Sequence, residues 1–156
     1  MTRILLVCMA NVCRSPTALA VARQRVLQLG LGKLLDFDSA GTHVRWPGQH
    51  PDPRAASVLS SQHYKLVKTR SRQISVQDFQ RSDLIVAMDD ANLAALQRQC
   101  APQHHGKLRL LLDFAPELGL REVPDPYYSG LAGFERVLAL CEAGVAGLIK
   151  SQTRVP

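Results

Sequence analysis

The sequence predicts an α/β protein in which helices flank a parallel sheet. Short apolar runs of strand length recur along the chain, segments with apolar residues at helical spacing lie between them, and turn residues separate the two. Strands and helices that alternate in this way join by right-handed crossovers, which collect loops at the carboxyl ends of the strands, where ligands bind. Functional residues are therefore expected in the loops that follow the apolar runs.

The first predicted unit is a buried strand followed by a helix. Residues 4–7 are all apolar, as expected of a strand covered on both faces of a parallel sheet. Ser15 is the predicted N-cap of the helix and Pro16 its first helical residue, and apolar residues recur at helical spacing as far as Gly30. The loop between this strand and this helix is therefore short.

The rest of the chain continues the alternation. Further strands are expected over residues 34–40, 83–88 and 108–112, and further helices from near Pro53, over 90–98 and over 130–149. Asp89 and Asp90 stand where a helix start favours negative charge, and we interpret them as that start rather than as a metal site. The charged residues from Lys65 to Arg72 are expected to form a solvated face.

Length and composition indicate one ordinary globular domain over residues 1–156. The chain is short for two domains, and its 46% apolar and 21% charged residues separate it from disordered proteins. The longest apolar stretch, residues 4–10, is too short to span a membrane. Val7 precedes Cys8 where a lipoprotein signal needs a small residue, so no export is expected. The four cysteines should then be reduced, in a cytoplasmic protein.

The net charge of +6 favours an anionic partner. The basic residues are scattered and form no zinc-finger or helix-turn-helix signature, so nucleic acid is not the expected partner, whereas a phosphorylated target fits. His104 and His105 near Cys100 do not form a zinc-binding pattern, because adjacent histidines point in different directions and no second ligand pair has the right spacing. The sequence therefore predicts neither a metal nor another cofactor.

Residues 8–15, which we call the phosphate loop, are the most informative segment. Five residues separate Cys8 from Arg14, between a strand and a helix start. A loop this short curls so that its backbone N–H groups form a nest for phosphate oxygens, with the helix dipole behind it. Arg14 can then bind two of those oxygens in bidentate geometry. The predicted phosphate-binding residues are Met9, Ala10, Asn11, Val12, Cys13, Arg14 and Ser15.

Cys8 is the predicted nucleophile. Positive charge at the helix start and at Arg14 favours its thiolate, which can attack phosphorus and form a phosphocysteine intermediate. Ser15 can donate a hydrogen bond to the sulfur when it leaves. The alternative is an ordinary buried cysteine at a strand end. Here the strand, the spacing, Ser15, Pro16 and the helix coincide, and this coincidence favours the catalytic interpretation.

The leaving oxygen of such a reaction needs a proton, so a carboxylic acid is expected to face the phosphate loop. Asp125 is the candidate, since Pro124 and Pro126 hold the backbone extended on either side of it. Judged on these residues alone, an aspartate in a proline-rich surface turn is the more common interpretation.

Residues 7–16 read VCMANVCRSP and closely resemble the signature of low-molecular-weight protein tyrosine phosphatases. The resemblance spans the whole chain, through residues 39–42, 52–55, 72–74, 88–89 and 125–128. It implies a single-domain four-stranded parallel sheet with helices on both faces and hydrolysis of phosphotyrosine through a phosphocysteine. It also implies that Asp125 is first general acid and then base, so the resemblance favours this catalytic role over an aspartate in a surface turn. Phosphotyrosine-containing proteins would be substrates, and inorganic phosphate and other oxyanions would bind as inhibitors.

The resemblance also implies roles for residues around the phosphate loop. Asn11 and Ser39 would pin the loop by hydrogen bonds, and the alternative for each is a local turn cap. Cys13 would form a reversible disulfide with Cys8 on oxidation, which would make the enzyme redox-sensitive. The alternative for Cys13 is a buried filler.

The pocket rim follows the family pattern in part. Tyr127 and Tyr128 would line the pocket wall together with Trp46, although packing alone also accounts for the tyrosines. The wall aromatic is displaced by one position, to Trp46, and Thr69 stands where many relatives have a histidine that supports the loop. Ala10 stands where the family usually has glycine, so a positive φ there would strain the loop. These departures predict a rim that selects substrates differently.

Other functions remain as alternatives. An arsenate reductase can use this fold and the first cysteine, but it needs two further cysteines to relay a disulfide, and Cys100 and Cys141 are forty-one residues apart. A phosphoarginine phosphatase typically has threonine where this chain has Val12. A non-catalytic phosphotyrosine-binding module is disfavoured because nucleophile, arginine and acid are all present. A basic nucleic-acid-binding domain is the weakest alternative.

Overall fold

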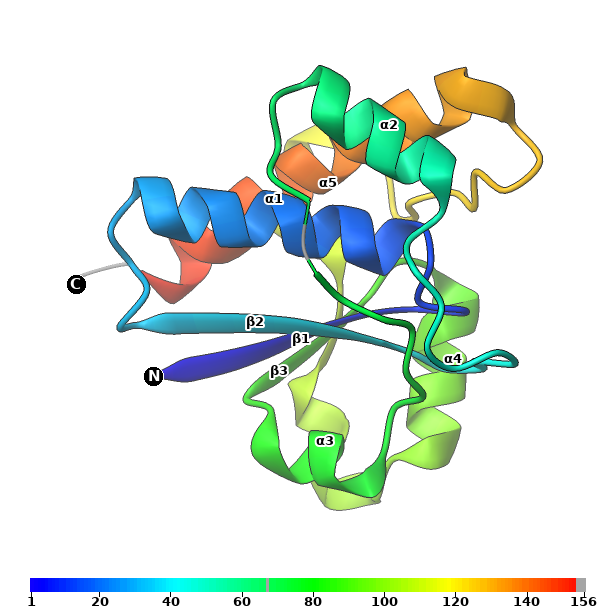
Figure 1. Ribbon diagram of the computed structural model, residues 1–156. Coiled ribbons are helices and arrows are strands. Elements are labelled where there is room, and N and C mark those ends of the chain that lie inside the picture. The colour runs from blue at the N-terminus through cyan, green and yellow to red at the C-terminus, as the bar shows by residue number, and fades with distance from the viewer. Residues whose placement is uncertain (67, 154–156) are drawn as a thin grey trace.

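The computed structural model describes residues 1–66 and 68–153, which form a sheet covered by helices on both faces (Figure 1). The strands are β1 (Thr2–Cys8), β2 (Leu35–Gly41), β3 (Leu84–Ala87) and β4 (Leu108–Leu110), all parallel in the order β2-β1-β3-β4. The α-helices are α1 (Arg14–Gln28), α2 (Pro53–Ser61), α3 (Val76–Arg81), α4 (Asp90–Gln99) and α5 (Gly130–Gln152). Short 3-10 helices are η1 (Pro102–Lys107), η2 (Leu111–Phe114) and η3 (Pro116–Leu118).

The predicted fold class, an α/β fold with a four-stranded parallel sheet between helices, is confirmed. Val67, within the expected solvated face, and residues 154–156, at the end of the expected domain, lie outside the described residues.

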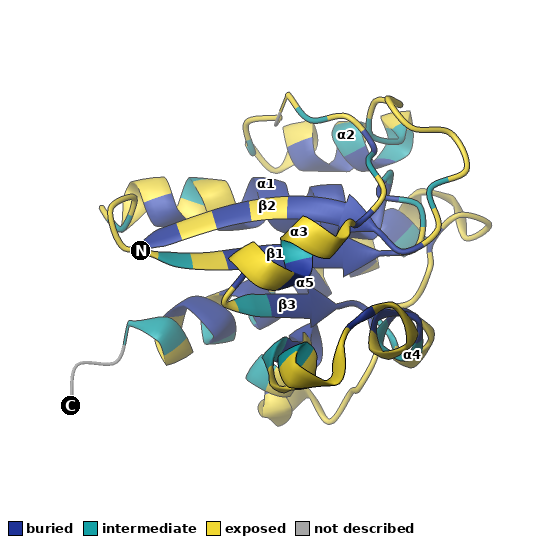
Figure 2. Cartoon of the chain, turned by 90° about the horizontal axis from the view of Figure 1, so that it is seen from below, coloured by how far each residue is buried: buried dark blue, intermediate teal, exposed yellow. Residues whose placement is uncertain are grey.

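Strand β1 lies inside the sheet and separates two cores. Its side chains alternate between the faces, as the two-residue period of a strand requires. Ile4 and Leu6 belong to the core under α1, α2 and α5, whereas Leu5 and Val7 belong to the core with α3 and α4 (Figure 1). Figure 2 shows β1 and β3 buried over most of their length. Burial on both faces explains why these strands appear in the sequence as continuous apolar runs.

The sheet order places the end of β1 at a change in winding direction. The chain passes from β1 to β2 on one side and later returns to β3 on the other. In sheets of this kind, ligands bind in the crevice at the carboxyl ends of the two strands where the direction reverses. Cys8 ends β1, and Met88 and Asp89 directly follow β3. The topology therefore brings Cys8 and Asp89 to one crevice.

The start of α1 differs from the sequence prediction. The helix begins at Arg14, and the residue in the N-cap position is Cys13, which makes no side-chain capping hydrogen bond. The prediction that Ser15 is the N-cap was wrong, because its hydroxyl faces Cys8 and Asn11 instead of the helix backbone.

The expected solvated face agrees with the structure at Lys65, Lys68 and Arg70, which are exposed, but not at Arg72. Arg72 is half-buried, and its guanidinium forms ion pairs with Asp38 at 3.0 Å and with Asp78 at 2.9 Å. Asp78 lies in α3, where it accepts hydrogen bonds from the backbone N–H and the hydroxyl of Ser75. Helix α3 was not predicted, since a helix of six residues is too short to display a helical period.

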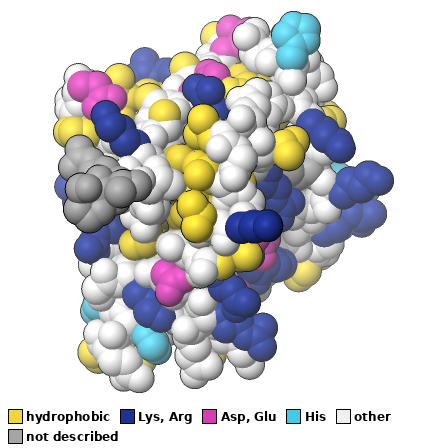
Figure 3. All heavy atoms as spheres, turned by 90° about the vertical axis from the view of Figure 1, so that its left-hand side faces the viewer, with side chains coloured by type: hydrophobic (Ala, Val, Ile, Leu, Met, Phe, Trp, Pro, Cys, Tyr) yellow, Lys and Arg dark blue, Asp and Glu magenta, His cyan; other side chains and the backbone are white. Residues whose placement is uncertain are grey.

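No helix in the described part of the chain is long and apolar enough to cross a membrane. The face at the amino ends of the strands lies opposite the phosphate loop, and Lys and Arg side chains occur on it at scattered positions (Figure 3).

Candidate active site

The phosphate loop connects β1 to α1 at the carboxyl edge of the sheet (Figure 1). Its two predicted functional ends are buried, since Cys8 and Arg14 are each 3% exposed. The loop packs tightly against the end of β2, because a Cβ on Gly41 would lie 2.6 Å from the carbonyl oxygen of Met9. A pocket of about 320 Å³ opens over the loop and is lined by Cys8, Met9, Ala10, Val12, Cys13, Arg14, Asp125, Tyr127 and Tyr128.

Asn11 is the residue at which the phosphate loop turns. Its φ of 59° lies in the left-handed region, which asparagine tolerates better than most residues with a side chain. Of the described non-glycine residues, Asn11 and His63 have a positive φ, and Ala10 does not. Ala10, which stands where the family usually has glycine, is therefore not strained by a positive φ.

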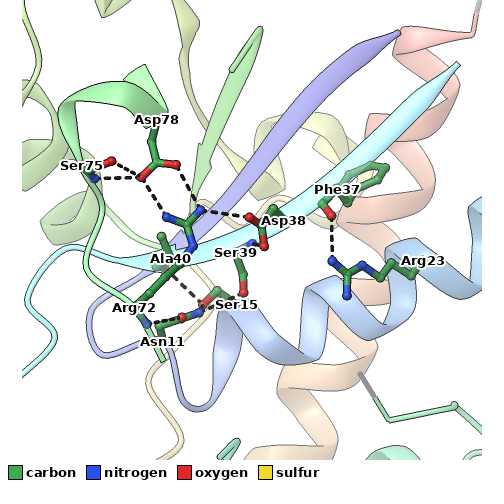
Figure 4. Close-up of polar contacts among 10 residues, drawn as sticks. All are labelled: Asn11, Ser15, Arg23, Phe37, Asp38, Ser39, Ala40, Arg72, Ser75 and Asp78. Carbon is green, nitrogen blue, oxygen red and sulfur yellow. Dashed lines mark hydrogen bonds and ion pairs between the residues drawn. The ribbon is translucent and has the colours of Figure 1, made fainter. Parts of the chain in front are cut away.

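The Asn11 side chain fixes the loop from within (Figure 4). Its Nδ2 donates to the hydroxyl oxygens of Ser15 at 2.8 Å and Ser39 at 3.0 Å. Its Oδ1 accepts a hydrogen bond from the backbone N–H of Arg72 at 3.0 Å. The amide thus uses both donors and its acceptor, and it joins the loop to β2 and to the segment before α3.

Ser15 lies directly against the predicted nucleophile. Its Oγ is 3.1 Å from the Sγ of Cys8. Because Oγ already accepts a hydrogen bond from Asn11, the hydroxyl proton remains available to the Cys8 sulfur or to the carbonyl of Ala40, 3.5 Å away. Ser15 can therefore stabilise a thiolate at Cys8 by donating this proton.

Arg14 is held along one edge and open along the other. Its Nη1 donates to the carboxylate of Asp89 and to the carbonyl oxygen of Val123, the latter at 3.0 Å. Within residues 1–66 and 68–153, Nε and Nη2 have no hydrogen-bond partner, so this edge can bind two oxygens of an oxyanion. Burial alone would lower the pKa of Arg14, but the negative charges of Cys8 and Asp89 outweigh burial and raise the pKa.

Asp89 is a site residue that the sequence analysis interpreted only as a helix start. That interpretation is confirmed, since Asp89 is the N-cap of α4 and its Oδ1 accepts from the backbone N–H of Asn92 at 2.7 Å. Its other oxygen binds Arg14. The sheet order could have predicted the contact with Arg14. Asp89 directly follows β3, and β3 is the neighbour of β1, which leads into the phosphate loop.

Cys13 lines the same pocket as Cys8, and its thiol is buried. Burial and then the nearby charges of Asp52 and Cys8 raise the pKa of the Cys13 thiol to about 12. At neutral pH Cys13 is therefore a protonated thiol. A thiol in the same pocket as Cys8 is compatible with the redox role that the family resemblance implies. It is equally compatible with simple packing.

The other side of the pocket is formed by residues 124–129, which we call the acid segment. Asp125 is exposed there, and its Oδ1 accepts a hydrogen bond from the backbone N–H of Tyr127 at 3.1 Å. Tyr127 is 49% exposed and Tyr128 96%, and their rings meet edge to face with centroids 4.9 Å apart. The acid candidate and two aromatic side chains thus form an open rim over the buried cysteine.

Two residues named with the rim lie elsewhere. Trp46 does not line this pocket, contrary to the expectation; its side chain is 64% exposed on the loop after β2, where the Arg45 guanidinium lies 5.6 Å from its ring centroid. Thr69 lines a separate apolar hollow with residues such as Pro16 and Leu59. The backbone N–H of Arg72, rather than a side chain at position 69, supports Asn11.

The ring of His105, near Cys100, is used structurally. The ring Nε2 of His105 lies 3.1 Å from the Gln97 carbonyl and 3.0 Å from the Cys100 carbonyl, at the end of α4. Among the described residues no group of three or more His, Cys, Asp or Glu side chains could hold a metal ion.

Fold and site together define a class: α/β proteins with a doubly wound parallel sheet and a cysteine–arginine phosphate loop after the first strand. A family model described as low molecular weight phosphotyrosine protein phosphatase matches residues 3–155. A low molecular weight protein-tyrosine-phosphatase of Streptomyces coelicolor is 43% identical over 150 residues, which are 94% of this chain and 91% of the relative. The chain therefore belongs to the low molecular weight phosphotyrosine protein phosphatase family, and the resemblance noted in the sequence is confirmed.

Solved structures agree with this assignment. A protein tyrosine phosphatase from Entamoeba histolytica is 37% identical and superposes with a TM-score of 0.91 over 96% of this chain and 95% of its own. A drosophila arginine phosphatase has the same TM-score of 0.91 at 28% identity, with both chains covered completely. Proteins with different named substrates thus share this fold, so the fold alone does not define the substrate.

Proposed function

We propose that this protein hydrolyses phosphotyrosine in proteins, with Cys8 as nucleophile, Arg14 as oxyanion clamp and Asp125 as general acid and base. One observation carries the proposal: residues from three separate parts of the chain line the same pocket. Cys8 from β1, Arg14 from α1 and Asp125 from the acid segment all line this pocket.

In the first step, the Cys8 thiolate attacks phosphorus while the three equatorial oxygens bind to Arg14 and to the backbone N–H groups of the loop. The bond between phosphorus and the tyrosyl oxygen breaks, and protonated Asp125 gives its proton to that oxygen. The products are a free tyrosine side chain, a phosphocysteine and an ionised Asp125.

In the second step, Asp125 takes a proton from a water molecule whose oxygen attacks phosphorus. The bond between phosphorus and sulfur breaks, and inorganic phosphate leaves. The hydrogen bond available from Ser15, 3.1 Å from the sulfur, stabilises Cys8 as the departing thiolate. Both chemical roles of Asp125 require that the acid segment stays over the phosphate loop throughout.

The rim favours a phosphate group carried on a long flat side chain. Tyr127 and Tyr128 offer aromatic contacts, each worth about 0.5–1.5 kcal/mol beyond simple burial, and phosphoserine is too short to bring its phosphorus to Cys8 at the pocket floor. Val12, which lines the pocket, presents methyl groups where a threonine would offer a hydroxyl to a guanidinium. These features support phosphotyrosine over phosphoarginine, the substrate class that the drosophila relative's name makes the second candidate.

A disulfide-relaying arsenate reductase fits the arrangement of cysteines poorly. Cys141 is buried in the core with α1, α2 and α5, whereas Cys100 is buried in the core on the opposite face of the sheet. A relay from Cys8 through these two thiols would have to cross the sheet.

The test is a comparison of kcat/KM for matched peptides that carry phosphotyrosine, phosphoserine, phosphothreonine or phosphoarginine, with native protein and with Val12→Thr. We expect phosphotyrosine to be the best substrate of the native protein and Val12→Thr to gain activity towards phosphoarginine. A native preference for phosphoarginine would overturn the substrate but leave the cysteine mechanism intact. An absence of turnover on every phosphopeptide would overturn the proposed function.

A further inference from the structure

We infer that Arg54 is a positioning residue that holds the acid segment, and with it Asp125, over the phosphate loop. The inference rests on the proposed function and adds a residue that touches neither the phosphate nor the reacting atoms. Arg54 lies in the first turn of α2, outside both loops and outside the residues that line the pocket.

One end of the Arg54 guanidinium holds the acid segment. Its Nη1 donates a hydrogen bond to the carbonyl oxygen of Tyr127 at 2.8 Å, two residues after Asp125. Its Cζ lies 5.2 Å from the ring centroid of Tyr127 and 4.5 Å from that of Phe134 in α5, within the range of cation–π contacts. In the described part of the chain, no other side chain from outside residues 124–129 donates a hydrogen bond to this segment.

The other end of the guanidinium is fixed by Asp52. Nε donates to Asp52 Oδ1 at 3.1 Å and Nη2 donates to Oδ2 at 2.9 Å, a bidentate pair that sets the plane of the guanidinium. The Asp52 side chain is only 11% exposed, and the hydrogen bond from Arg54 lowers the pKa of this carboxyl, so the pair stays charged at neutral pH.

Asp52 is in turn joined to the phosphate loop. Its backbone N–H donates to the carbonyl oxygen of Val12 at 2.7 Å. A continuous path of hydrogen bonds therefore runs from Val12 through Asp52 and Arg54 to Tyr127. This path connects the loop that binds phosphate to the segment that carries the acid, and it sets their separation.

Loss of this connection should affect proton transfer and leave phosphate binding alone. The acid segment would occupy a wider range of positions, and a displacement of about 1 Å in a reacting group can cost about 10²-fold in rate. The phosphate loop keeps its own hydrogen bonds through Asn11, so the affinity for inorganic phosphate should not change.

The experiment measures kcat and KM of Arg54→Ala and Arg54→Lys on a phosphotyrosine peptide and on p-nitrophenyl phosphate, together with the inhibition constant of inorganic phosphate. For Arg54→Ala we expect a fall in kcat of about 10- to 100-fold on the peptide, whose leaving group needs a proton, and a smaller fall on p-nitrophenyl phosphate. Arg54→Lys should recover part of the loss, because an ammonium group keeps the charge but not the bidentate fork. The inhibition constant of phosphate should stay unchanged.

The decisive arm combines Arg54→Ala with Asp125→Asn. If Arg54 acts through Asp125, the double variant should be no slower than Asp125→Asn alone. Arg109→Ala is the matched control, since its guanidinium also donates to backbone carbonyls, those of Gly106 and Leu108, but far from the pocket lining. Asp52→Asn is the second variant. Asp52 is the N-cap of α2, where its Oδ1 accepts from the backbone N–H of Arg54 at 2.8 Å, and asparagine caps a helix as well as aspartate does. This variant loses only the charged bidentate partner of Arg54, so it should reproduce the leaving-group pattern with α2 intact.

Equal losses on both substrates, a weaker inhibition by phosphate, or losses that add in the double variant would overturn the positioning role. If the native protein hydrolyses no phosphopeptide, the proposed function fails before this comparison is reached, so the two failures are distinguishable. If Arg54→Ala does not fold, the same readouts on Arg54→Lys and Asp52→Asn decide the question.

Discussion

The phosphate loop and the acid segment form one pocket but are held in different ways. In the phosphate loop, Asn11 and Arg14 are 2% and 3% exposed, and each forms several hydrogen bonds to distant parts of the chain. In the acid segment, Tyr128 is 96% exposed, and Arg54 supplies a hydrogen bond from outside.

The difference follows the chemistry expected of each part. A site that stabilises charge on phosphoryl oxygens works best when its dipoles are already oriented before the reaction, and the buried loop provides this. The acid segment has to let a protein side chain enter and leave, so it is exposed, and Arg54 holds it from outside. We therefore expect changes in the loop to affect all phosphate esters alike, and changes in the segment to depend on the leaving group.

The largest expected effect is that of Cys8→Ser in the phosphate loop. A serine hydroxyl is not ionised at neutral pH, so kcat should fall by about 10⁴-fold or more on both a phosphotyrosine peptide and p-nitrophenyl phosphate. Sulfate should still bind in calorimetry, since Arg14 and the backbone nest remain. Turnover near the native rate would remove Cys8 from the mechanism.

Arg14→Lys should have the next largest effect. Lysine cannot bind two oxygens with one planar group while it also pairs with Asp89, so kcat should fall by about 10²- to 10³-fold. Steady-state kinetics with inorganic phosphate as competitor should show weaker inhibition as well. Arg109→Lys is the control for loss of a guanidinium elsewhere, and equal behaviour of the two variants would contradict the clamp.

Asp125→Asn should separate the two regions most clearly. The kcat should fall by about 10²- to 10³-fold on the phosphotyrosine peptide and clearly less on p-nitrophenyl phosphate, which leaves without a proton. The inhibition constant of phosphate should hardly change. Equal losses on the two substrates would mean that Asp125 does not act as a general acid.

Replacing Asn11 should show how much the internal bonds of the phosphate loop stabilise it. Asn11→Gly leaves the hydroxyls of Ser15 and Ser39 without their donor and should lower the free energy of unfolding by about 1–3 kcal/mol. Asn11→Ala should lose about 1 kcal/mol more, because alanine is strained at a φ of 59°. Urea denaturation measures both, and identical values would show that the left-handed turn carries no strain.

The smallest expected effect on native activity is that of Cys13→Ser, which matters only after oxidation. Peroxide converts the Cys8 thiolate to a sulfenic acid, and attack by the Cys13 thiol forms a disulfide with loss of water. In the native protein, a thiol reductant should then restore most of the activity. In Cys13→Ser it should restore less, because Cys8 oxidises further. Equal recovery would leave Cys13 as packing.

The fold and the phosphate loop could be predicted because their information is local. Buried strands appear as continuous apolar runs, and Cys8, Arg14 and Ser15 lie within eight consecutive residues. Asp125 was different, since a proline-rich turn with one aspartate is common, and the family resemblance was needed to single it out. The structure places it in the pocket with Cys8, and its catalytic role stays a proposal.

Some site residues were not predicted, because their roles depend on contacts between segments that are distant in the sequence. Asp89, Arg54 and Arg72 reach the site through crossovers of the sheet, and a charged residue near a helix start looks the same in a sequence whether or not it has a partner. The N-cap prediction for Ser15 was also wrong because the sequence does not show its partners. The curl of the loop brings its hydroxyl to Asn11 and Cys8. Trp46 was placed on the wall by the family pattern, whereas the loop after β2 carries it outwards.

The exposure of Tyr128 has a consequence for how this enzyme could change over generations or in the laboratory. A side chain that is 96% exposed contributes little to folding, and substitutions at such positions usually alter stability by less than about 0.5 kcal/mol. Mutations there can accumulate without loss of the folded protein, while the oxyanion-binding machinery beneath stays fixed. Libraries that randomise Tyr128 alone should therefore yield mostly folded, active variants that differ in the peptides they prefer.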